Sequence, residues 1–167
     1  MKTVRSACQL QPNALSVKLS DQIEQLDDLI HTEGDGTAFF DKTFITQGMR
    51  DLISEGIARL AGASSQAVFH LKQAMGGGKT HLLIGFGLLA KHPQLRQQYC
   101  ADVPHASEFE SANIAAFNGR NNPERFFWGE IAYQLGKGEQ ARNPKKFHST
   151  AANEEDCLFL FEGDQPV

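Results

Sequence analysis

The sequence predicts an α/β fold, an incomplete three-layer sandwich with a parallel β-sheet, preceded by a helical segment. Two observations support this prediction. Over residues 1–62, apolar side chains recur at steps of three and four residues, which is the period of an amphipathic helix. From residue 63, short apolar runs bounded by turn formers alternate with helical patterns, and this order is typical of a parallel sheet. We therefore expect a helical segment over 1–62 and a sheet-containing domain over 63–167.

The helical segment is predicted from two stretches of the chain. Apolar residues at helical spacing predict one helix over 14–30 and a second over 46–60. The stretch 31–37 is rich in glycine and is predicted to be the loop between them. Gly62 marks the end of the second helix.

The sheet-containing domain is predicted from strand-like and helix-like runs. A short apolar run bounded by turn formers is typical of a buried strand, whereas apolar residues one turn apart indicate a helix face. Gly85 and Gly87 are poor helix formers, so we expect them to allow close packing against the sheet. The predicted elements are strands over 67–71 and 112–117, helices over 81–91 and 128–135, and a surface loop over 138–155.

Composition and charge exclude several classes of protein. Hydrophobic residues make up 41% of the chain and charged residues 22%, which are ordinary values for a soluble globular protein. The formal net charge is −4, so no strong positive field indicates nucleic acid or an anionic membrane as a general partner. Cys8, Cys100 and Cys157 favour reduced thiols over a disulfide framework or a zinc site. The longest apolar run, 82–90, is too short to span a bilayer, and we expect a cytoplasmic protein with no membrane partner.

A glycine-rich loop between the first predicted strand and its helix carries the chemistry. Three successive glycines let the backbone curl so that several N–H groups can point at one anion. The helix that follows adds its terminal N–H groups and the positive end of its dipole. Lys79 can reach the β- and γ-phosphates of a nucleotide, and the hydroxyl of Thr80 can join the coordination of Mg²⁺. The predicted binding residues are Met75, Gly76, Gly77, Gly78, Lys79, Thr80 and His81.

The loop departs from the full pattern G-x-x-x-x-G-K-[ST] at its first position, where this sequence has Gln73 in place of glycine. The remaining Gly-Gly-Gly-Lys-Thr lies after a predicted strand and before a predicted helix. This context predicts a P-loop NTPase domain that binds a nucleoside triphosphate with Mg²⁺.

Other polar and aromatic residues have an ordinary explanation beside a functional one. Trp128 and Tyr133 could stack on a base, but packing in the core is the commoner role of such residues. Glu130 is interpreted as a surface carboxylate. Arg120 and Arg125 could reach a phosphate, but surface arginines are commoner.

The sequence offers no convincing acid for ATP hydrolysis. A P-loop fold needs a carboxylate at the tip of a buried strand to hold Mg²⁺ and position water. The closest match is Glu162 after the apolar run 158–161, but Gly163 follows at once and favours an exposed bend. The catalytic residues are therefore unknown, because the chain does not contain the strand that would carry this acid.

Four segments of the chain occur in the order and with the residues of a known family, namely 40–46, 73–81, 128–136 and 160–167. They resemble the domain of unknown function 499 family, large AAA-type P-loop ATPases that prokaryotes often encode beside phage-defence genes. The resemblance implies ATP and Mg²⁺ as cofactors, with Lys79 and Thr80 as binding residues. In the family, the Pro-Val position leads into a strand that ends in an Asp-Glu pair, whereas Val167 is the last residue here.

The resemblance therefore implies an N-terminal fragment of a larger ATPase. Its P-loop domain, 63–167, would be truncated before the Walker B strand, and it would bind ATP but hydrolyse it poorly. DNA or defence-system proteins are the partners that it implies for the missing regions. Two other functions stay open. One is a self-contained phosphotransferase, similar to a nucleotide kinase, that would use Glu162; the other is a non-catalytic module whose helices bind a partner.

Overall fold

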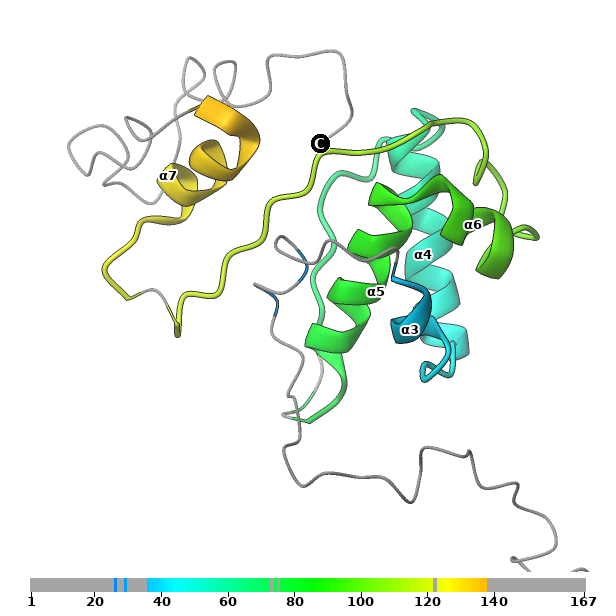
Figure 1. Cartoon of the computed structure of the whole chain (residues 1–167), viewed down its shortest axis with the longest axis horizontal. Helices are drawn as coiled ribbons and strands as arrows, with labels where there is room; N and C mark the ends of the chain where they lie inside the picture. The colour runs from blue at the N-terminus through cyan, green and yellow to red at the C-terminus, as the bar shows by residue number, and fades with distance from the viewer. Residues whose placement is uncertain are drawn as a thin grey trace, which may run out of the picture.

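The computed structural model describes residues 26, 29, 36–72, 74, 76–121 and 123–137, and their regular elements are helical. The elements are α3 (Thr37–Phe40), α4 (Gln47–Leu60), α5 (Lys79–Lys91), α6 (Pro93–Tyr99), α7 (Phe127–Ala132) and a wide helical turn, η2 (Tyr133–Lys137). The helices α3, α4 and α6 gather around α5, and an extended stretch of chain leads from this group to α7 (Figure 1).

The predicted parallel sheet, and with it the P-loop three-layer sandwich, is wrong: the part of the chain that the structure describes contains no β-strand. The stretches 67–71 and 112–117 are extended, but neither is a strand of a sheet. Val68 is 75% exposed and Phe69 36%, so the first stretch is not the buried strand that its apolar residues predicted. A short apolar run fixes neither the partner nor the burial that a strand requires. The run 157–161 lies outside the described residues.

The helix predicted over 46–60 is confirmed as α4. The Thr46 hydroxyl accepts a hydrogen bond from the Met49 amide at 3.3 Å and caps the first turn. One face of α4 packs against α5 and forms the centre of a single apolar core. The buried residues of this core are Leu29, Phe40, Ile53, Ile57, Ile84, Leu88, Leu89, Leu95, Cys100 and Val103. Apart from Leu26 and Leu29, the helix predicted over 14–30 lies outside the described residues.

The helix predicted over 81–91 is confirmed as α5, which begins two residues earlier, at Lys79. Gly85 and Gly87 allow close packing, but against the helical segment and not against a sheet. A Cβ at Gly85 would lie 3.2 Å from the Phe39 ring, and one at Gly87 would overlap a methyl group of Leu29. These two glycines therefore let α3 and Leu29 approach the backbone of α5.

Arg96 in α6 is fully buried and joins the turns and bends of residues 106–110 to the end of α5. Its guanidinium lies 3.8 Å from the centre of the Phe109 ring. Burial lowers the pKa of Arg96, although an arginine stays charged in a protein. Its N–H groups donate, at 2.5–3.1 Å, to the carbonyls of Leu89, Ala90, Ala106, Phe109 and Glu110.

Cys100 follows α6 and is 2% exposed, so one of the cysteines lies in the core. Burial raises the pKa of its thiol. In a Cys8→Ser, Cys157→Ser variant, we expect Cys100 to react with a thiol reagent at least about tenfold more slowly in native buffer than in denaturant, because about 1.4 kcal/mol of opening free energy already gives that factor. Equal rates in the two conditions would contradict the buried position.

Candidate functional site

Two of the three glycines of the predicted phosphate-binding loop adopt a backbone conformation that glycine takes far more readily than other residues. Gly76 has a φ of +80° and Gly78 a φ of +74°, both in the left-handed region. A Cβ at either position would meet no atom within 4 Å apart from its chain neighbours. Glycine is therefore favoured at these positions by the positive φ angle and not by a lack of room for a side chain. The Gly77 amide donates to the Ala74 carbonyl at 3.1 Å, which closes a turn and engages this N–H.

The loop runs directly into α5. Gly78 is the N-cap residue, and the Leu82 amide donates a helical hydrogen bond to the Gly78 carbonyl at 2.9 Å. The amide groups that precede this bond lie in the first turn of the helix. There the helix dipole is positive, and backbone N–H groups can donate to an anion.

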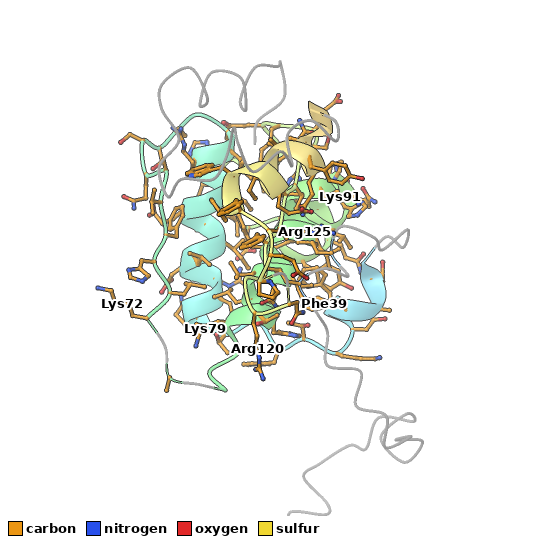
Figure 2. All side chains as sticks on the ribbon, turned by 90° about the vertical axis from the view of Figure 1, so that its left-hand side faces the viewer. Phe39, Lys72, Lys79, Lys91, Arg120 and Arg125 are labelled. Atoms are coloured by element: carbon orange, nitrogen blue, oxygen red, sulfur yellow. The ribbon has the colours of Figure 1, made fainter. Side chains whose placement is uncertain are left out.

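Lys79 and Thr80 are the first two residues of α5. The Lys79 ammonium group donates to the Ala74 carbonyl at 3.0 Å, so the side chain reaches back over the loop. Figure 2 shows Lys79 at the N-terminal end of α5, and Lys72 on the chain that leads into the loop. Thr80 is exposed. The glycines, Lys79 and Thr80 thus share one helix end; that they bind phosphate stays a prediction, and Met75 lies outside the described residues.

His81 lies in the same turn of α5, and its ring faces α3. The imidazole stacks on the Phe39 ring, with the ring centroids 4.4 Å apart and 26° between the planes. Its Nε2 atom lies 3.0 Å from the Thr43 hydroxyl oxygen. Neither neighbour of His81 was predicted from the sequence. The available signal was Gly85, four residues after His81, since a glycine one turn along a helix makes room for a ring.

The candidate residues near α7 form a network of their own. The Arg125 guanidinium lies 2.9 Å from one carboxylate oxygen of Glu130, and the Gln134 amide donates to the other at 3.2 Å. Glu130 is 6% exposed, so its interpretation as a surface carboxylate is wrong. A buried carboxylate requires such partners because burial without them is costly. Arg120 is exposed.

The same network holds the extended stretch 112–117. The Gln134 side chain accepts a hydrogen bond from the Ala116 amide at 2.7 Å and donates one to the Ala116 carbonyl at 2.9 Å. The Trp128 ring packs edge-on against the Phe127 ring, with centroids 4.9 Å apart. The contacts of Glu130 and Gln134 join α7 and η2 to the preceding chain, whereas the Trp128 ring contacts a residue of its own helix.

The fold and the loop define a helical domain that presents a glycine-rich loop at the beginning of a buried helix. Residues 13–103, more than half of the chain, match the model of the DUF499 N-terminal domain. The chain therefore belongs to the DUF499 family. No curated protein and no solved structure matches it. Within the described ranges, no helix has the length and apolar character to cross a membrane, and no three His, Cys, Asp or Glu side chains form a group that could hold a metal.

Proposed function

We propose that the loop Gly76–Thr80 and the first turn of α5 bind the phosphate groups of ATP with Mg²⁺. The observation that carries the proposal is the pair of left-handed glycines, Gly76 and Gly78, directly before a helix that begins with Lys79 and Thr80. Glycines with a left-handed backbone directly before a helix can turn several N–H groups toward one anion, which is what a phosphate requires.

Each residue has a distinct task in this proposal. The Lys79 ammonium exchanges its contact with the Ala74 carbonyl, a neutral acceptor, for the β- and γ-phosphates, which are charged acceptors and bind it more strongly. The Thr80 hydroxyl is a ligand for Mg²⁺. The exposed position of the loop leaves room for a nucleotide.

We further propose that the chain is the ATP-binding part of a larger AAA-type ATPase of a prokaryotic defence or DNA-associated system. Membership of the DUF499 family supports this context. Conformational change driven by ATP, and contacts with DNA or defence proteins, would then belong to the larger protein. The residues that hydrolyse ATP are not assigned.

Lys79→Ala is expected to weaken binding of Mg²⁺-ATP roughly tenfold or more, because it removes charge-assisted contacts of about 1.5–3 kcal/mol. The measurement is a calorimetric titration of the 167-residue chain. Lys72→Ala is the matched control: it also removes an exposed positive charge near the loop, and its affinity should stay close to that of wild type. Equal affinities of the wild type and Lys79→Ala would overturn the proposal.

A further inference from the structure

The first turn of α5 is joined to α3 by two contacts of one side chain. The flat face of the His81 ring stacks on Phe39, and the edge of the ring, through Nε2, lies within hydrogen-bond distance of the Thr43 hydroxyl. Both partners come from the short segment 39–43, which consists of the end of α3 and the turn that follows it. His81 is two residues from Lys79, so this contact adjoins the proposed phosphate site.

The hydrogen bonds of this contact have a defined direction. The Thr43 hydroxyl donates its proton to the Phe39 carbonyl at 2.7 Å. A hydroxyl has one proton to donate, so Thr43 accepts from His81, and the imidazole carries its proton on Nε2. The bonds run from His81 to Thr43 to Phe39, the residue whose ring also stacks on the imidazole. The ring of His81 is thus fixed in both position and orientation.

The segment 39–43 is itself firmly placed. The Phe39 ring lies over Gly85, where a Cβ would be 3.2 Å from it, so Phe39 covers two successive turns of α5. Phe40 is buried and stacks on Tyr99 of α6 with centroids 4.7 Å apart. The segment therefore connects the start of α5 to α6.

We propose that Phe39 and Thr43 are positioning residues for the phosphate-binding loop: through His81 they fix the direction in which the first turn of α5 presents its amide groups. The inference rests on the function proposed above. It assigns the His81 side chain to the segment 39–43 and not to a phosphate. By linkage, a nucleotide that binds best to the fixed helix end must also stabilise the docked segment 39–43.

The first test is a double-mutant cycle on the affinity for Mg²⁺-ATP. Thr43→Val and His81→Ala should each weaken binding by about fivefold or more, which is the usual range of coupling between sites. The double variant should bind no more weakly than His81→Ala alone, because both changes remove the same contact. Phe44→Ala is the matched control, since Phe44 adjoins Thr43 but is 85% exposed, and it should leave the affinity unchanged.

An affinity lost in His81→Ala but unchanged in Thr43→Val would overturn the inference, because it would make the His81 side chain a direct phosphate ligand. Thr43→Val replaces a side chain by one of the same shape, so this variant alone tests the inference if His81→Ala does not fold. If Thr43→Val binds Mg²⁺-ATP with the affinity of the wild type, the inference is overturned.

The second test is hydrogen exchange with and without Mg²⁺-ATP. In the wild type, ATP should slow exchange both in the loop, 76–82, and in the segment 37–46. In Thr43→Val at saturating ATP, protection of the loop should remain and protection of 37–46 should fall. Protection confined to 76–82 in the wild type would overturn the inference and keep the proposed function. No protection anywhere, together with no binding, would overturn both.

Discussion

Replacement of Arg96 by lysine is expected to lower the free energy of unfolding by about 3–5 kcal/mol, although it keeps the positive charge. Arg96 satisfies five backbone carbonyls, from Leu89 to Glu110, with one planar group. Lysine has only three donors, placed around one nitrogen, and cannot reach all five. Each buried carbonyl left without a partner costs about 1–3 kcal/mol.

This loss is large beside the whole stability of a domain, which is about 5–15 kcal/mol. Urea unfolding followed by circular dichroism measures it directly. Gln98→Ala, an exposed change on the same helix, is the control and should stay within about 0.5 kcal/mol of the wild type. A midpoint for Arg96→Lys equal to that of the control would contradict the role given to the guanidinium.

Two glycine-to-alanine changes in α4 are expected to have opposite signs. A Cβ at Gly56 would lie 2.5 Å from atoms of the Phe86 ring, so the ring must move, which costs about 1–3 kcal/mol. Alanine gains up to about 1 kcal/mol over glycine inside a helix. The packing cost is larger than this gain, so we expect Gly56→Ala to destabilise the protein by about 1–2 kcal/mol.

Gly48 is the matched control because it lies in the same helix, and a Cβ there would meet nothing within 4 Å. Gly48→Ala should therefore raise the melting temperature slightly, while Gly56→Ala lowers it by about 2–4 °C for each kcal/mol lost. Thermal melts of the two variants provide the comparison. A higher melting temperature for Gly56→Ala would show that α4 and α5 are not in close contact at Phe86.

The helices α4 and α5 could be predicted from the sequence because each carries apolar residues that the core buries. In α4 the buried residues lie on one face, whereas in α5 they include four in succession, 87–90, and extend beyond one face. Their apolar residues recur at helical spacing, and Thr46 is a typical helix-capping residue. The strands could not be predicted in the same way. The run 67–71 is apolar, but Val68 lies in solvent, since burial of an extended stretch depends on partners elsewhere in the chain.

The candidate site could be predicted only where its features depend on local sequence. The positive φ angles of Gly76 and Gly78 follow from local sequence, because glycine is the residue that adopts them easily. The contact between His81 and Thr43 spans 38 positions of the chain and leaves no periodic pattern. The burial of Arg96 and Glu130 could not be predicted from the sequence either. Charged residues in a helix are usually exposed, and only the folded chain shows what surrounds these two.

The paired hydrogen bonds between Gln134 and Ala116 have a consequence for association with other molecules. An extended stretch with open N–H and C=O groups is a template on which a foreign peptide can add as a strand. At Ala116 both groups are already hydrogen-bonded to the side-chain amide of Gln134. This amide makes the same pair of hydrogen bonds that the backbone of an added strand would make. A peptide that docks along 112–117 on the side that the Ala116 N–H and C=O groups face must first displace Gln134, which is one of the partners of the buried Glu130.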